Sequence, residues 1–442
     1  MERRLLLQSL AAGASAALVS PWVFAQDRYT RYRGQTVRIS IPMHPHFDAM
    51  QKLLPAFTRE TGIKVQVEQL PMAEMKKKQL LEMAKPQCDF DLVAYVVMWK
   101  GEYVRKQFVS DLAPFFDDAK LADPQFDMAD IVPGYRENIG LVGGWKGYLA
   151  GPDAKLYGLP YGAETSVLAY RKDIFEKHKL TPPASYIELE RLLPVLREKT
   201  GEGALTSRGK AGHQCVHAWL LHLNPLNGKI FENNWTTRLN DRAGVRALKI
   251  LKTIVDTGPA GSAEFGQVEM MDAFLQGRSA MYLDSTVIFG AVRDPAKSKI
   301  GGKVGYARHP GGGKHSAQSG GLGLAIPKTA QNANAGFLLM QWLTAKEQDK
   351  AVSRLGGSPQ RLSTLADAGL LRQFPEFEVL RYFIRDADPD WRPIIPEWDE
   401  INTEVLGIAV HNALTGKTTS EFALNEAAQK VTAIMQRGNY LR

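Results

Sequence analysis

Two hydrophobic periodicities alternate in the N-terminal part of the chain. Residues 36–41 (TVRISI) and 63–68 (IKVQVE) place an apolar side chain at every second position, as half-buried strands do. Residues 47–57 place apolar side chains at helical spacing, and residues 74–84 predict a second helix. Residues 91–97 (DLVAYVV) form a continuous apolar run, which is typical of a parallel strand covered on both faces. The predicted order is therefore strand, helix, strand, helix, strand.

This order predicts a parallel sheet with right-handed crossovers. In open sheets of this type, ligands bind at the carboxyl ends of the strands. The loops at residues 42–47 and 98–100 follow two of these strands. We therefore expect ligand-binding residues in these two loops.

Residues 157–175 (YGLPYGAETSVLAYRKDIF) predict a crossing between two lobes. A turn-rich approach leads into an apolar strand at residues 167–170, and a helix follows. Glu164 lies in the middle of this crossing, where a carboxylate needs a partner or a function. Beyond it, the pattern predicts mainly helices and two strands: helices at 185–200, 215–223, 242–256 and 268–275, and strands at 280–284 and 319–327.

Residues 1–25 have the three parts of a secretory signal. Arg3 and Arg4 precede an apolar run at residues 5–19. Val23 and Ala25 occupy the two positions that a leader peptidase reads, which suits cleavage after Ala25. The two arginines also suit twin-arginine export, but Glu2 replaces the usual hydroxyl residue, so both Sec and Tat routes stay open. We expect a periplasmic protein without a lipid anchor, because no cysteine lies near the cleavage site.

Composition narrows the class of protein. The chain has 442 residues, which suggests two domains after the leader is removed. The formal net charge is +8, but the basic residues are dispersed and the compact run 76–78 suits a solvated helix face, so we expect no nucleic-acid binding. Cys88 and Cys215 fall in different predicted lobes, and we expect no disulfide between them.

Motifs that carry catalysis or bind cofactors are incomplete. Gly416-Lys417-Thr418 ends like a phosphate-binding loop, but His411 stands where its first glycine should be. His213 and His217 have the spacing of a zinc-protease helix, yet the residue after His213 is Gln instead of the required Glu. We expect no metal, no cofactor and no catalytic residue.

Several longer stretches resemble the family 1 extracellular solute-binding proteins of ABC transporters, which include the maltose- and the sorbitol/mannitol-binding proteins. They are the crossing with its G-x-P-x-x-x-E approach, FTRETGIKVQVE, AFLQGRSAMYLDST, QWLTAKEQDKAV and HNALTGKTTSEFALNEAAQKV. The resemblance implies an α/β fold of the two-lobe type II periplasmic binding protein, each lobe a mainly parallel sheet flanked by helices, joined by a hinge. It implies an N-lobe of residues 26–164 and 285–331, a C-lobe of residues 165–284 and 332–442, and three crossings.

The resemblance also implies a function in transport. We expect a monomeric periplasmic protein that closes around a small carbohydrate ligand, namely a sugar, polyol or short oligosaccharide, and delivers it to an inner-membrane ABC permease. Flat apolar faces and planar polar side chains suit such a ligand. By their place in loops, by their match to the family's sugar-contacting positions, or by their lack of a side chain, the candidate ligand-binding residues are His44, His46, Phe47, Tyr95, Trp99, Tyr161, Glu164, Trp219, Asp284, Gly320, Gly321, Arg392 and Trp398.

Alternatives remain at this point. The ligand could belong to another solute class, such as a glycerol phosphodiester or another anion, and an arginine or carboxylate in the cleft would discriminate. A secreted glycoside hydrolase would need two carboxylates flanking the cleft, and Glu164 with Asp284 is the pair to consider. Trp219 could instead belong to the core, because leucines surround it, and Glu164 could be a structural partner of an arginine.

Overall fold

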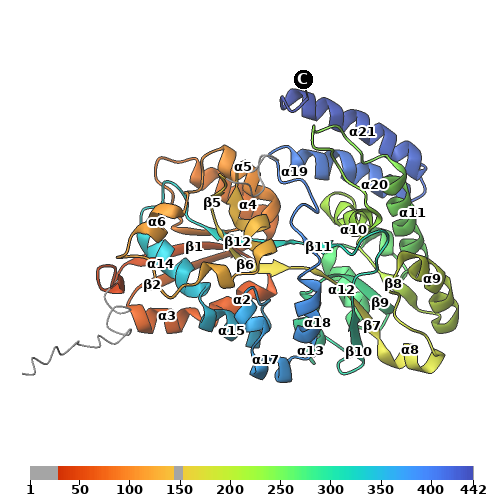
Figure 1. Ribbon diagram of the computed structural model, residues 1–442, viewed down its shortest axis with the longest axis horizontal. Helices are drawn as coiled ribbons and strands as arrows, with labels where there is room; N and C mark the ends of the chain where they lie inside the picture. Colours follow the sequence, from red (N-terminus) through yellow and green to blue (C-terminus); the bar gives the residue numbers. More distant parts are fainter. Residues whose placement is uncertain (1–27, 144–152, 442) are drawn as a thin grey trace, which may run out of the picture.

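The computed structural model describes residues 28–143 and 153–441, which form two lobes, each built around its own sheet (Figure 1). The expected leader and its cleavage site lie outside the described residues. Within the described ranges, no helix is both long and apolar enough to cross a membrane. Cys88 and Cys215 are free and buried.

The first lobe contains the predicted strand-helix-strand-helix-strand unit. Its sheet has the order β2-β1-β3-β12-β6, in which β1 pairs with β2 and β3 in parallel and β12 pairs with its two neighbours in antiparallel orientation. The strands are β1 (Thr36–Pro42), β2 (Lys64–Leu70), β3 (Leu92–Val96), β6 (Leu159–Glu164) and β12 (Gly320–Ala325). The order expected from hydrophobic periodicity is confirmed.

One predicted helix of this lobe is two helices. The helical spacing at 47–57 is divided between α2 (Pro45–Gln51) and α3 (Leu54–Thr61), and Pro55 lies in the first turn of α3. Proline lacks a backbone N–H, so it fits the first turn of a new helix and would interrupt a continuous one. The helix α4 (Met72–Met83) follows β2, close to its predicted position.

The second lobe has a four-stranded sheet of order β10-β7-β9-β8. The central strand β7 pairs antiparallel with β9 and β10, and only β8 with β9 is parallel, so this sheet is mixed where a mainly parallel one was expected. Every residue of β9 is buried. The strands are β7 (Ser166–Arg171), β8 (Gly203–Thr206), β9 (Ser279–Ser285) and β10 (Val304–Ala307).

Helices cover this sheet and extend beyond it (Figure 1). Those before β9 are α8 (Lys172–His178), α9 (Tyr186–Thr200), α10 (His213–Leu223), α11 (Arg242–Thr257) and α12 (Gln267–Leu275). The C-terminal helices α20 (Gly407–Leu414) and α21 (Ser420–Arg437) contribute to one apolar cluster with α10 and α11. The four helices expected in this lobe are present.

The lobes divide the chain differently from the expected boundaries. Strand β10 pairs with β7, so the part of residues 285–331 before β12 lies in the second lobe. The helix α14 (Ala333–Leu343) shares the apolar core of β1 and β3 in the first lobe, although residues 332–442 were assigned to the C-lobe. An apolar helix pattern shows that α14 is buried but does not show which sheet it covers. Trp342 lies in this core, with its ring centroid 5.3 Å from that of Phe57.

The chain passes between the lobes through segments that bond to one another. The first crossing joins β6 to β7 at Thr165, whose carbonyl accepts a hydrogen bond from Thr286 N. The second joins β11 (Ala317–Gln318) to β12, and Gln318 N donates to Ser166 Oγ at 3.0 Å. Gly320 pairs with Glu164 across β12 and β6. The first two crossings therefore lie side by side.

The third passage lies between Arg361 and Glu376. Arg361 binds Asp130 of the first lobe at 3.1 Å, while Glu376 at the start of α18 (Glu376–Phe383) forms an ion pair with Arg293. Arg293 ends α13 (Ile288–Arg293), which packs with β10 on the second lobe through Phe289 and Tyr306. The chain thus crosses three times, with the last passage near residues 361–376.

Replacing Gly321 by Ala tests the irregular pairing beside the hinge. Gly321 has a φ of +96°, and an added Cβ would lie 2.3 Å from the carbonyl oxygen of Gly162. Gly356 has the same φ, but an added Cβ there meets nothing within 4 Å. We expect Gly356→Ala to cost about 1–2 kcal/mol through backbone strain alone, and Gly321→Ala to cost at least about 1 kcal/mol more. Denaturant unfolding measures both, and equal losses would contradict the role of the backbone contact.

Candidate ligand-binding site

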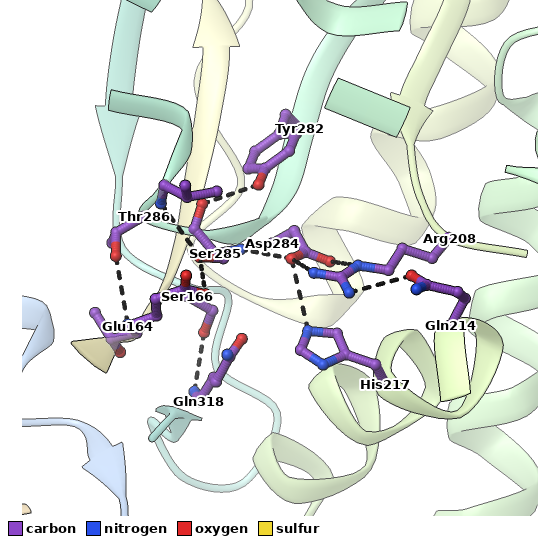
Figure 2. A network of polar contacts seen from close by, with 12 residues as sticks. Glu164, Ser166, Arg208, Gln214, His217, Tyr282, Asp284, Ser285, Thr286 and Gln318 are labelled. Atoms are coloured by element: carbon purple, nitrogen blue, oxygen red, sulfur yellow. Dashed lines mark hydrogen bonds and ion pairs between the residues drawn. The ribbon is translucent and has the colours of Figure 1, made fainter. Parts of the chain in front are cut away.

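Two buried carboxylates meet where the two sheets adjoin. Glu164 ends β6 of the first lobe, and Asp284 lies near the end of β9 in the second. Ser285 connects them, because its hydroxyl donates to Glu164 Oε2 and its backbone N–H donates to Asp284 Oδ1 at 2.7 Å (Figure 2). The crossing therefore carries two acidic groups that need compensation.

Glu164 obtains its compensation from both lobes. His44 Nε2, from the loop after β1, lies 3.1 Å from Glu164 Oε1, and both side chains are buried. Burial alone would raise the pKa of Glu164, but the hydrogen bond and charge of His44, together with Ser285 and Arg208, hold it below its usual range. Glu164 is therefore ionised at neutral pH.

Asp284 is held by a buried arginine. Arg208 Nε donates to Asp284 Oδ2 at 2.9 Å, Nη2 donates to Oδ1, and Nη1 donates to Gln214 Oε1 at 3.2 Å (Figure 2). His217 Nε2 approaches Asp284 Oδ1 to 3.6 Å. Burial would raise the pKa of Asp284, but the charge and hydrogen bonds of Arg208, together with the nearby His217, hold it far below its usual range.

The first turns of α10 bring two histidines to this cluster. Burial, with the nearby charge of Arg208, lowers the pKa of His217 to about 4, and burial with the charge of Arg392 holds that of His213 well below its usual range. Both rings are therefore neutral at pH 7 and able to donate and accept hydrogen bonds. Within the described part of the chain, no three His, Cys, Asp or Glu side chains are grouped to hold a metal ion.

Trp391 and Arg392 connect the second lobe to the first. Trp391 Nε1 donates to Ser319 O in the second crossing, and the Arg392 guanidinium carbon lies 4.2 Å from the centroid of the Trp391 ring. Arg392 Nη1 lies 3.8 Å from the sulfur of Met98, which follows β3 of the first lobe. A Cβ on Gly320 would lie 3.3 Å from Arg392 Nη2. This arginine is therefore buried between the two lobes.

Five of the thirteen expected residues meet in this cluster: His44, Glu164, Asp284, Gly320 and Arg392. The other eight lie elsewhere. His46, Phe47 and Tyr161 form a ring cluster in the core of the first lobe, with centroids 4.4 Å apart for His46 and Tyr161. Tyr95 also points into that lobe, where its hydroxyl donates to Ile139 O.

Of the remaining four, Trp219 belongs to the core of the second lobe, since its Nε1 donates to Gly244 O beneath α11. Trp99 is buried beside Tyr103, with Lys76 Nζ 5.6 Å from its ring. Trp398 is fully buried in the apolar cluster that contains Trp391. Gly321 forms the bulge of β12, where its backbone is adjacent to Gly162.

The structure adds residues that sequence reasoning did not select. They are Arg208, His213, Gln214, His217, Ser285, Gln318 and Trp391. The two histidines were noticed for their spacing but rejected with the failed zinc motif. Trp391 was not selected, although its neighbour Arg392 was. Arg208 lies in a loop with no periodic pattern, so no local signal identifies it.

The two carboxylates do not suit glycoside hydrolysis. That chemistry needs one carboxylic acid with a raised pKa to protonate the leaving group. The pKa values of Glu164 and Asp284 are both held below their usual range, because His44 and Arg208 are their closest partners. Neither is a proton donor at neutral pH, so the geometry favours binding.

Comparison with known protein families identifies one that matches most of the chain. The model of the bacterial extracellular solute-binding proteins matches residues 42–350. The chain belongs to this family. The resemblance noted in the sequence is thereby confirmed, and so is the assignment to solute-binding proteins of transporters instead of enzymes.

Two named relatives align with most of this chain. A probable amino-acid ABC transporter periplasmic-binding protein of Sinorhizobium fredii is 24% identical over 457 residues, covering all of both chains. A mannitol-binding protein of Pseudomonas aeruginosa is 27% identical over 339 residues, covering 71% of this chain and 75% of the relative.

Solved structures agree on the two-lobe fold. An ABC transporter solute-binding protein of Agrobacterium radiobacter K84, in complex with ribitol, superimposes with a TM-score of 0.81 at 26% identity, covering 91% of this chain and 99% of that chain. A solute-binding protein of Agrobacterium vitis S4, with bound D-mannitol, superimposes with a TM-score of 0.79 at 24% identity. The match covers 92% of this chain and 100% of that chain. The expected fold is therefore confirmed.

Replacing Asp284 by Asn tests the buried ion pair. We expect a loss of about 3–5 kcal/mol in the free energy of unfolding at pH 7, because Arg208 would remain buried without its counter-ion. The folded pKa of Asp284 is lowered, so the stabilisation is complete above the unfolded value of about 3.9 and is lost as the pH falls. The difference between wild type and variant should shrink below about pH 4.

Asp272→Asn is the matched control for Asp284→Asn. Asp272 pairs with Arg278 at 3.0 Å on the surface, where both side chains are about half exposed. We expect a change within about 0.5 kcal/mol for this variant. Chemical unfolding followed by circular dichroism between pH 3 and pH 8 measures the free energy of unfolding of both variants. Similar losses would show that the buried pair of Asp284 with Arg208 stabilises the fold no more than a surface pair.

Proposed function

We propose that this protein binds a sugar, a polyol or a short oligosaccharide between its two lobes and delivers it to the permease of an ABC importer. The observation that carries the proposal is the buried polar cluster at the crossing, which contains carboxylate, guanidinium, amide and imidazole groups. Such planar groups donate or accept paired hydrogen bonds, as neighbouring hydroxyls of a carbohydrate require.

Several buried polar atoms beside the crossing lack a hydrogen-bond partner among the described residues. They include Gln318 Oε1 and Arg392 Nε. A buried polar group without a partner costs free energy, and a bound hydroxyl would remove that cost. These atoms support a polar ligand at the place where the lobes meet.

We propose a ligand-binding set based on the clustered residues: His44, Glu164, Arg208, His213, His217, Asp284, Gln318, Gly320, Trp391 and Arg392. We include Trp391 because indole rings pack against the C–H groups of sugars, and its ring lies beside Arg392 and His217. The relatives support this ligand class, since the Pseudomonas aeruginosa protein is named for mannitol and the Agrobacterium radiobacter structure holds ribitol.

The biological setting belongs to the same proposal. We propose a monomer that is exported to the periplasm by Sec or Tat with cleavage after Ala25, and that closes on its ligand before it meets an inner-membrane permease. The family of extracellular solute-binding proteins supports the location. Hinge closure is driven by ligand contacts that both lobes share.

A thermal-shift screen tests the proposed function. At a concentration 100 times its dissociation constant, a sugar or polyol should stabilise the folded protein by about 2.7 kcal/mol and raise its melting temperature accordingly. The library should include ribitol, mannitol, sorbitol, maltose and trehalose, with amino acids, polyamines and inorganic phosphate as other classes. The recovered ligand should be chemically unchanged, as chromatography can check.

The screen can also reject the proposal. A shift with amino acids or polyamines, and none with any carbohydrate, would remove the carbohydrate claim. Release of nitrophenol from nitrophenyl glycosides, abolished by Glu164→Gln, would instead support an enzyme.

Replacing Glu164 by Gln tests the hydroxyl acceptor at the hinge. The amide keeps the shape of the carboxylate but removes its charge, and a hydrogen bond to a charged group contributes about 1.5–3 kcal/mol. We expect the affinity for a carbohydrate found in the screen to fall about 10- to 100-fold by isothermal titration calorimetry. Trp219→Phe, in the core of the second lobe, should lower the melting temperature and leave affinity unchanged. Unchanged affinity in Glu164→Gln would contradict the role of Glu164.

A further inference from the structure

Among the described residues, the buried cluster contains one arginine, Arg392, that forms no ion pair with a carboxylate. The carboxylate of Asp284 is bound by Arg208 through two hydrogen bonds, and that of Glu164 is bound by His44 and by the hydroxyl of Ser285. Each carboxylate therefore already has a partner on this chain. Arg392 is the remaining charged group that faces them.

Arg392 is 4% exposed and forms no ion pair with any carboxylate of the described residues. Its Nε has no hydrogen-bond partner, and its Nη1 reaches only the sulfur of Met98 at 3.8 Å. A thioether is a weak acceptor, and the ring of Trp391 attracts the cation without accepting a hydrogen bond in its plane. Burial and the charge of Arg208 lower the pKa of Arg392 to about 9, although the charges of Glu164 and Asp284 oppose this shift.

A buried arginine without a counter-ion is costly, and its fork of N–H donors matches a carboxylate in two parallel hydrogen bonds. We propose that Arg392 binds a carboxylate of the ligand, so that the transported solute is a sugar acid, an aldonate or a uronate. This rests on the proposed function, in which a polyhydroxylated solute binds between the lobes. The hydroxyl groups of the acid then contact the rest of the cluster.

Gly320 lets its backbone approach the guanidinium closely. A Cβ at this position would lie 3.3 Å from Arg392 Nη2 and 3.2 Å from Gln318 Nε2, which is closer than most side-chain contacts. Gln318 Oε1 also lacks a hydrogen-bond partner, so an acceptor for a ligand hydroxyl lies next to the proposed carboxylate position. Neutral His213 and His217 add hydrogen-bonding groups without adding charge.

A sugar acid fits the charges of the cluster better than two other classes of charged solute, phosphates and amino acids. A phosphate carries close to two negative charges at neutral pH, whereas Arg208 is already paired with Asp284 and leaves one arginine. An amino acid would bring an ammonium group that needs a free carboxylate, and both buried carboxylates are occupied. A single negative charge surrounded by hydroxyl groups matches the cluster.

Calorimetric titration of matched pairs tests this inference on the mature protein. Each pair compares an acid with its neutral counterpart: D-gluconate with sorbitol, D-ribonate with ribitol, D-glucuronate with D-glucose, and D-galacturonate with D-galactose. In at least one pair we expect the acid to bind at least about 30-fold more tightly than its neutral counterpart. The reason is that only the acid can form a desolvated ion pair with two hydrogen bonds to Arg392. Added salt should weaken the acid more than its neutral counterpart.

Three variants assign the preference to Arg392. Arg392→Gln removes the charge, and the preference for the acid should fall to about threefold or less. Arg392→Lys keeps the charge without the planar fork and should retain part of the preference. Arg385→Gln is the control, because Arg385 is an exposed arginine beside the ring of Tyr382, outside the cluster, and should keep the full preference.

The outcomes separate this inference from the proposed function. If neutral members bind as tightly as their acids, the inference fails and the carbohydrate function stands. If no member of any pair binds while another solute class does, the proposed function fails, and the inference with it. Tighter binding of glucose 6-phosphate than of glucuronate would overturn the carboxylate, and an acid preference that survives in Arg392→Gln would overturn the role of Arg392. If Arg392→Gln does not fold, the inference is judged by two other measurements. They are the ratio of acid to neutral affinity in the wild-type protein and the same ratio in Arg392→Lys.

Discussion

Charge compensation at the crossing is the constraint on which the rest of the structure depends. Glu164 and Asp284 are buried side by side through Ser285, and an ionised carboxylate inside a protein is tolerated only with close partners. The partners come from distant parts of the chain: His44 follows the first strand, and Arg208 precedes α10. Each ion pair lies within one lobe, and the hydroxyl of Ser285 joins the two pairs across the crossing, which couples the arrangement of the lobes to the polar cluster.

Behind this cluster the second lobe is stiffened by a chain of buried polar side chains. Ser166 Oγ lies 2.9 Å from His309 Nδ1, and the Tyr186 hydroxyl lies 3.2 Å from His309 Nε2 and 2.8 Å from His222 Nδ1. Burial lowers the pKa of His309 to about 4 and that of His222 to about 3, so both rings are neutral and the chain carries no net charge. A satisfied network of this kind fixes the geometry of the core. Ser166 Oγ also accepts a hydrogen bond from Gln318 N at the crossing. The rigid network therefore ends at the hinge between the two lobes.

The sequence predicted the elements well and the site in part, for physical reasons. Strand alternation and helical spacing report burial directly, so the βαβαβ unit and the first crossing were found. Glu164 was found because a carboxylate in an apolar, turn-rich segment needs a partner. Aromatic residues were less informative: Tyr95 and Trp219 face the cores, because a pattern of burial does not distinguish a core from a cleft. Arg208 was missed, since its importance depends on a partner 76 residues away.

Contacts between the lobes suggest how binding is made reversible. Away from the cluster, Lys76 pairs with Asp399 at 2.9 Å and Arg105 pairs with Glu397 at 2.6 Å, joining the first lobe to the segment after Arg392. One partner of each pair is about half exposed, and such pairs contribute about 0–1 kcal/mol. They can orient the lobes but cannot hold them shut. The free energy that favours closure must then come from buried contacts, namely an apolar cluster that includes residues of both lobes, such as Tyr135 and Phe289, and the polar cluster with its ligand.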